Sequence, residues 1–179
     1  MIKSKKIAVL MMVVTILCSV FLTGCKNVNV DEEITINNCN ESAVKVAEGF
    51  LQSVFTENED LFYKCFPATA FEEGDKAFEA YIAGNADVGK FIGCKYVNFN
   101  DYNEDNGYNQ EWMKTNISLM HNVEEDDIQK IQIVKIDVCF EGANKKEYNS
   151  VSAYVLVYQL NDNNWYALEI QNSDAEFAA

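Results

Sequence analysis

Residues 151–160, VSAYVLVYQL, decide the fold, because apolar side chains stand at both parities of this segment and predict a central β-strand. Asn161-Asp-Asn-Asn164 follows as a tight turn, and Trp165–Ile170 returns as the last strand. Upstream, residues 131–141 alternate between an apolar and a charged face. The apolar positions are Val134, Ile136, Val138 and Phe140, and the charged ones are Lys135, Asp137 and Glu141. The C-terminal third therefore predicts three long antiparallel strands.

Helical periodicity precedes these strands. From Ser42, the apolar positions that predict an amphipathic helix are Val44, Ala47, Phe50, Leu51, Val54 and Phe55. Thr56-x-x-Glu59 and Thr69-x-x-Glu72 have the form of capping boxes and predict that two more helices start there. Pro67 ends the first of these, and Gly84-Asn85 ends the second.

The middle of the chain predicts a strand over residues 91–99, a turn-rich loop over 100–108 and a short helix over 109–121. The predicted buried face of that helix is Trp112, Met113, Ile117 and Met120. Helices gathered ahead of a meander, with one apolar sheet face to cover, indicate an α+β fold. We therefore expect a single domain over residues 42–172, with the helices packed on one side of a curved antiparallel sheet. Residues 173–179 form a C-terminal tail.

The N-terminal residues have the order of a secretory signal. Lys3, Lys5 and Lys6 precede an apolar run from Ile7 to Leu22. A transmembrane anchor is the alternative, but the 16 residues of this run reach only about 24 Å as a helix, short of the roughly 30 Å hydrocarbon core.

Leu22-Thr-Gly-Cys25, at the end of this run, resembles the lipobox of bacterial lipoproteins. The resemblance implies removal of residues 1–24, a diacylglyceryl thioether on Cys25, and anchoring at the outer face of the cell membrane. Two or more acyl chains give stable anchoring. Residues 25–41 are polar and predict a tether between the lipid and the domain.

Charge excludes several classes of partner. The chain has 14 lysines, no arginine and 28 acidic residues, and removal of the three signal lysines leaves 11 positive groups and a net charge of −17. Such a charge repels nucleic acid and anionic lipid headgroups. The lack of arginine also removes the bidentate group that phosphate sites usually employ. Nucleic acid is therefore not an expected partner.

No catalytic motif accompanies the single histidine, His121, whose place at a helix end suits a capping role. HExxH, Gly-x-Ser-x-Gly and Gly-rich phosphate loops are all missing from the sequence. Asp101-x-Asn103-x-Asp105 matches the first half of a calcium loop, but Gly107 and Trp112 stand at positions 7 and 12, where the pattern fails. An acidic surface turn is favoured over a weak calcium site, and no catalytic, cofactor or metal residue is assigned.

Cys39, Cys65, Cys94 and Cys139 remain once Cys18 leaves with the signal and Cys25 is lipidated. Four thiols in an exported chain suggest up to two disulfides, with three connectivities possible. The alternative is that free cysteine packs as a small hydrophobe, which suits Cys65 on its helix face. Cys139 shares the parity of Lys135 and Asp137, so we expect its thiol to be exposed. Of the four cysteines, it is therefore the one we most expect to form a disulfide.

Three aromatic residues of the last two strands, Tyr154, Tyr158 and Trp165, form a candidate contact surface for a partner or a glycan. The alternative for each is packing against a neighbouring strand.

The helical segments resemble those of a known fold family. Ala47-Glu-Gly-Phe50-Leu51, the restart at Glu57-Asn-Glu-Asp-Leu61-Phe62 and the stop at Phe66-Pro67 are one part of the likeness. Val155-Leu-Val-Tyr158 and the closing Trp165-Tyr166 are the other. Together they resemble small clostridia-type lipoproteins with a nuclear transport factor two-like, cystatin-related cone. The resemblance implies a curved sheet wrapped around helices and no particular activity.

The expected role is a non-catalytic one at the cell surface: binding a small ligand, a wall component or another envelope protein. Two alternatives stay open, an enzyme with a carboxylate–tyrosine pocket beneath the helices, and a structural module without a pocket. An enzyme needs converging ionisable groups, whereas a binding module needs a pocket or an exposed aromatic patch.

Overall fold

The structure is a computed structural model that describes residues 26–29, 42–72, 75–83, 89–141 and 147–171. Its helices are α2 (Ser42–Phe55), α3 (Glu59–Lys64), α4 (Ala77–Ala83) and α5 (Gln110–His121), with 3-10 turns η1 (Glu104–Asn106) and η2 (Glu125–Asp127). Its strands are β1 (Lys26–Asn29), β2 (Phe91–Asp101), β3 (Ile128–Glu141), β4 (Glu147–Leu160) and β5 (Trp165–Gln171). The predicted signal and C-terminal tail lie outside the described residues. Within the described ranges, no helix is both long and apolar enough to cross a bilayer.

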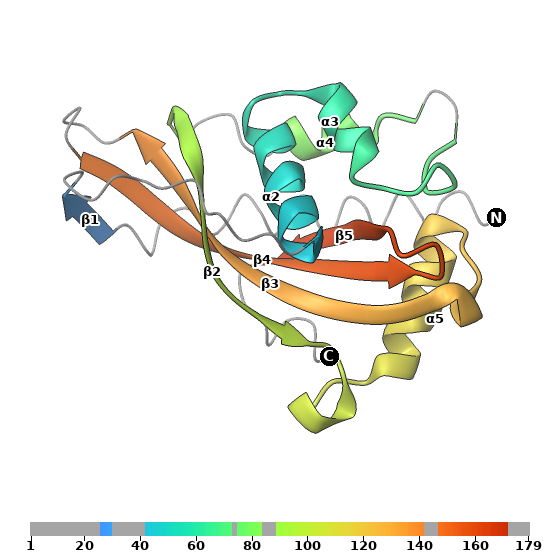
Figure 1. The fold of residues 1–179 in the computed structure, drawn as a ribbon. Coiled ribbons are helices and arrows are strands. Elements are labelled where there is room, and N and C mark those ends of the chain that lie inside the picture. The colour runs from blue at the N-terminus through green and yellow to red at the C-terminus, as the bar shows by residue number, and fades with distance from the viewer. Residues whose placement is uncertain (1–25, 30–41, 73–74, 84–88, 142–146, 172–179) are drawn as a thin grey trace.

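One antiparallel sheet contains all the described strands, as the sequence predicts for its C-terminal third. The strand order is β1-β4-β3-β2, and β5 also pairs with β4. Because β3 occupies one edge of β4 along its length, β1 and β5 share the other edge: β1 pairs with residues 147–150 and β5 with residues 154–159. Register shifts in β2 add local bends, and the sheet is visibly curved (Figure 1).

One face of the sheet is covered by α2, α3 and α4, which confirms the predicted α+β fold (Figure 1). The even positions of β3 that the sequence assigns to the core, Val134 to Phe140, are all at most 2 % exposed. They meet α2 through Val44, Ala47, Phe50, Leu51 and Val54, the residues predicted for its inner face. Phe50 lies at the centre, with its ring 5.1–5.7 Å from those of Phe62, Phe66 and Tyr81.

A second core lies on the opposite face, where α5 packs, so the expectation that all helices cover one side is wrong. This core joins Met113 and Ile117 of α5 to Ile131 and Ile133 of β3. Leu156, Tyr158 and Leu168 complete its sheet side. The physical reason is that β4 is apolar at both parities, and near this end β3 places Ile131 and Ile133 on the face opposite Val134, so both faces of the pair are buried there.

The starts of α3 and α4 differ from the predicted capping boxes. Asn58 caps α3 by accepting a hydrogen bond from Leu61 N at 3.0 Å. The Thr56 hydroxyl instead donates to Gln52 O of the preceding turn. The helix predicted from Thr69 begins later, at Ala77. Both Thr and Asn are competent caps, and tertiary packing decides which one is used.

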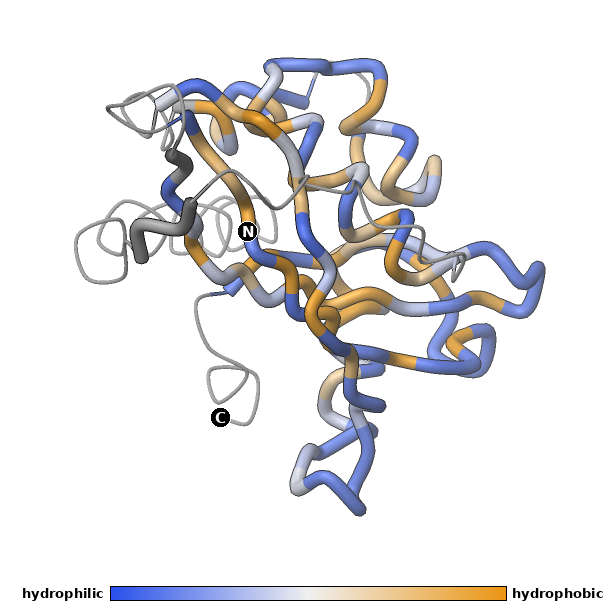
Figure 2. Tube along the Cα trace, turned by 60° about the vertical axis from the view of Figure 1, so that its left-hand side comes forward, coloured by the Kyte–Doolittle hydropathy of each residue, from blue (hydrophilic) through white to orange (hydrophobic). Residues whose placement is uncertain are grey.

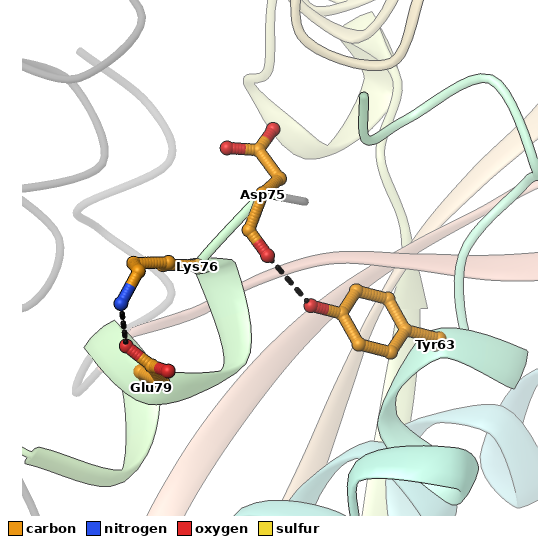
Figure 3. Close-up of polar contacts among 4 residues, drawn as sticks. All are labelled: Tyr63, Asp75, Lys76 and Glu79. Atoms are coloured by element: carbon orange, nitrogen blue, oxygen red, sulfur yellow. Dashed lines mark hydrogen bonds and ion pairs between the residues drawn. The ribbon is translucent and has the colours of Figure 1, made fainter. Parts of the chain in front are cut away.

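Polar contacts hold the segment between α3 and α4 (Figure 3). The Tyr63 hydroxyl donates to the Asp75 carbonyl oxygen at 3.1 Å. Lys76 and Glu79 form an ion pair at 3.1 Å, but both side chains are mostly exposed and solvent screens the pair. The Tyr63 hydrogen bond therefore adds to the ring contacts of Phe62 with Phe78 and Tyr81, which pack α3 against α4.

Strand β1 lies inside the stretch predicted as a free tether. Its four residues, Lys26–Asn29, pair with Glu147–Ser150 of β4. The first residue of β1 follows Cys25 directly in the chain. Four residues of the predicted tether are thus paired in the sheet, while residues 30–41 lie outside the described part.

Hydrophobic residues follow the strands and the inward sides of the helices, and the turns at the ends of the elements are hydrophilic (Figure 2). Beyond the area that α5 covers, the second sheet face is polar. Ser152 Oγ donates to Asp137 Oδ1 at 2.7 Å, and Lys95 stands opposite Asp137 on β2. Lys135 Nζ lies 5.3 Å from the centre of the Tyr154 ring. The charged face predicted for β3 is therefore found in this part of the strand.

Candidate interaction surface

The three candidate disulfide residues that the structure describes are not bonded to one another. Cys65, Cys94 and Cys139 are free and buried, and Cys39 lies outside the described residues. Cys139 shares the face of Asp137 but is 0 % exposed, so its predicted exposure is wrong. Burial raises the thiol pKa to about 12 for Cys65 and Cys94 and to about 11 for Cys139, with smaller contributions from nearby charges at the latter two. These thiols therefore stay protonated and behave as small core residues.

The candidate calcium loop is occupied by its own hydrogen bonds. Asn103 caps η1, accepting from Asn106 N at 3.1 Å, and Asp101 Oδ1 accepts from Gln132 Nε2 at 2.8 Å. Gly107 closes the turn at φ 83°, a left-handed conformation that suits glycine. Among the described residues, no group of three or more potential ligands is placed to hold a metal ion. Asp101, Asn103 and Asp105 thus belong to an acidic surface turn.

The three aromatic residues proposed as a contact surface do not lie together. Trp165 packs against the core beneath α2, whereas Tyr154 lies beside the core beneath α5. Tyr158 is 0 % exposed, so it is not available to a partner. The alternative, packing against neighbouring strands, is the arrangement that the structure shows for Tyr158: its ring lies 5.9 Å from that of Tyr166 on β5.

Tyr158 instead joins His121, the last residue of α5, across the second core. The two residues share a hydrogen bond of 2.6 Å between His121 Nδ1 and the Tyr158 hydroxyl, and His121 is only 4 % exposed. The His121 ring also packs edge-on against Phe66, at 5.6 Å. Since Phe66, just after α3, belongs to the core beneath α2, His121 links both layers at the β5 edge. Beside it, the Cys65 carbonyl accepts from Ala167 N at 2.7 Å.

Glu48 is the carboxylate placed beneath the helices. It is half-buried on α2, and its Oε1 is enclosed without a hydrogen-bond partner among the described residues. Desolvation raises the pKa of its carboxyl group. Tyr81 in the same core has a raised pKa, from burial first and from the charge of Glu169 second. A tyrosine with a raised pKa stays protonated near neutral pH and therefore serves as a hydrogen-bond donor rather than as a base.

An exposed aromatic side chain, that of Trp112, lies on the outer side of α5. Asn109 caps the helix, accepting from Trp112 N at 3.0 Å, and Asn122 ends it in the left-handed conformation at φ 53°. Met113, Ile117 and His121 face the sheet. Trp112 was predicted to be buried with them, but it is 47 % exposed, and Leu119 is 66 % exposed. His121, which the sequence assigned to a cap, fills the position one turn beyond Ile117 instead.

Acidic residues stand at both ends of this helix. Glu104, Asp105 and Glu111 are exposed at its N-terminal end. Glu124, Glu125 and Asp126 are exposed after its C-terminal end. We call Trp112, Leu119 and these six acidic residues the α5 face. It is an apolar centre between two negatively charged ends, a pattern typical of an interaction surface rather than of an active site.

Comparison of the chain with protein-family models, characterised proteins and solved structures finds no match. Function is therefore inferred from the chemistry of this chain's own residues.

Replacement of Tyr158 by Phe is expected to lower the free energy of unfolding by about 1–3 kcal/mol, because buried His121 loses its bond to the hydroxyl. Urea unfolding of the purified domain measures the change. Tyr154→Phe is the matched control: this tyrosine is half-buried, and its change is expected to stay within about 0.5 kcal/mol. Equal effects of the two substitutions would contradict a specific role for the His121–Tyr158 bond.

Replacement of Glu48 by Gln is expected to stabilise the domain near pH 7 but not below the ordinary pKa of 4.5. A raised pKa in the folded state means that stability is lost as the pH rises through it, and glutamine removes that loss. The gain should not exceed about 1 kcal/mol, because solvent screens a half-exposed group. Thermal unfolding from about pH 4 to about pH 7 measures it, with exposed Glu124→Gln as the control. A gain that is independent of pH would show that desolvation of the carboxylate is not its cause.

Proposed function

We propose that this protein is an exported lipoprotein that is anchored through Cys25 and acts as a non-catalytic interaction module at the outer face of the cell membrane. Support for the anchor comes from the sequence: a basic start, an apolar run and Leu22-Thr-Gly-Cys25. Support for the interaction role comes from the α5 face, where Trp112 and Leu119 are exposed although neither is needed by the core.

The lipid anchor and the α5 face lie at different places in the fold, and their separation supports the proposal. Strand β1, which begins at the residue after Cys25, pairs with the first residues of β4, around Tyr148. Helix α5 packs near the other end of β4, around Tyr158 (Figure 1). Ten residues of strand separate these points, a distance of about 33 Å. A lipid on Cys25 therefore places β1 near the membrane and holds the α5 face away from it.

A cone of the nuclear transport factor two-like, cystatin-related kind remains our proposal for the family. What supports it is the curved antiparallel sheet with α2, α3 and α4 on one face. If the fold is such a cone, it also has to include α5, which packs on the second face of the sheet. The fold by itself assigns no activity.

Photo-crosslinking in intact cells tests the function. A photoreactive amino acid replaces Leu119 in the full chain, and a second strain carries it at exposed Glu59 on α3 as the control. We expect one reproducible envelope protein to crosslink from position 119 and not from position 59. A Cys25→Ser variant should leave the membrane fraction and lose the crosslink. Equal products from both positions would contradict the interaction role, and retention of Cys25→Ser at the membrane would contradict the lipid anchor.

A further inference from the structure

The way apolar and acidic residues are placed along the α5 face indicates the chemistry of the partner it would bind. Trp112 and Leu119 are seven residues apart, so they lie about 20° apart around the helix and about 10 Å apart along its axis. Half-buried Asn116 lies between them, and its side chain donates to the Trp112 carbonyl oxygen at 3.1 Å. The polar group of Asn116 is thereby turned back onto the helix. The two apolar side chains thus form a stripe on one side of the helix, with Asn116 between them.

The charges at the two ends of this stripe have the same sign. Turn η1 supplies Glu104 and Asp105 at one end, and η2 supplies Glu125 and Asp126 at the other. The two turns lie at opposite ends of α5 (Figure 1). Lys114, the single lysine of the helix, is half-buried. Since α5 has 12 residues, its two ends, beyond which the acidic turns lie, are about 18 Å apart.

This distribution disfavours three kinds of occupant. A second copy of the chain would bring acidic ends against acidic ends, and like charges in contact cost several kcal/mol. Anionic lipid surfaces and nucleic acids are repelled for the same reason. A small apolar ligand would cover Trp112 and Leu119 but would leave the acidic ends unused.

We propose that the α5 face binds a cationic amphipathic segment of another envelope protein, in which an apolar centre lies between two groups of lysine or arginine. Apolar side chains of that segment cover Trp112 and Leu119, and its basic ends lie over η1 and η2. Trp is favoured at the centre of such contacts because it buries a large area with little loss of side-chain freedom. The charged ends speed the encounter and fix its direction. This inference rests on the interaction role proposed above.

A synthetic helical peptide tests the partner chemistry. Its two ends carry lysines about 18 Å apart, which is about 12 helical residues, and its centre carries leucine on one side. One reference peptide has glutamate in place of lysine, and another has serine in place of leucine. Each is labelled with a dye and titrated, by fluorescence anisotropy, into the lipidated full chain held in zwitterionic vesicles.

We expect the Lys/Leu peptide to bind and both reference peptides to bind at least about tenfold more weakly. Trp112→Ala with Leu119→Ala should weaken binding about tenfold or more, and neither side chain is required by the core. Glu104→Gln with Asp105→Asn should weaken binding and reduce its dependence on salt.

The control separates a specific site from the general negative charge of the chain. Glu59→Gln with Asp60→Asn removes two exposed charges from α3, on the other side of the sheet, and should change the affinity by less than about twofold. An equal loss in this control and in the η1 variant would overturn the proposal, as would equal binding of the glutamate peptide. A crosslink from position 119 without selective peptide binding would keep the interaction role and reject the cationic partner. Failure of both the crosslinking and the peptide-binding experiment would reject both the interaction role and the cationic partner.

Discussion

The full-length pairing of β3 with β4 is the constraint on which the rest of this structure depends. The register runs from Ile128 opposite Leu160 to Glu141 opposite Tyr148. Because successive side chains point to opposite faces, this register alone decides which residues meet α2 and which meet α5. A slip of one residue in one strand would exchange its two faces and bring the charged side chains of β3 into the core. Strands β1 and β5 then take their places along the remaining edge of β4.

The two layers of helices are coupled at one end of this hairpin. Phe66 belongs to the core beneath α2, Tyr158 to the core beneath α5, and His121 contacts both. A histidine that looks isolated in the sequence is therefore a buried link between layers. Its location also fixes the rotation of α5, since His121 and Ile117 face the sheet together and the opposite side of the helix points outward. The exposure of Trp112 and Leu119 is a consequence of that rotation.

Local patterns were enough to predict strands β2 to β5, the first helix and the α+β class, because these depend on apolar spacing within one segment, whereas they gave no sign of β1. The second core could not be predicted in the same way. Ile131 and Ile133 share the parity of Lys135 and Asp137, and the charged residues make the whole face look solvated. The strand is long enough that one part of this face lies beneath α5 and the other part does not. The prediction that Cys139 is exposed fails for the same reason. The parity of a strand residue predicts the sheet face on which its side chain lies, but not whether other residues cover that face.

The central functional claim is that the α5 face is held away from the membrane by the lipid on Cys25. The most direct measurement is energy transfer from a dye on the lipidated protein to an acceptor in the vesicle membrane. The dye is placed at Leu119→Cys on α5 or at Asn149→Cys beside β1, in a chain that also carries Cys39→Ser. The other native thiols, Cys65, Cys94 and Cys139, are buried. The account predicts clearly weaker transfer from position 119 than from position 149, in keeping with a separation of about 33 Å along the sheet. Equal or stronger transfer from position 119 would contradict it.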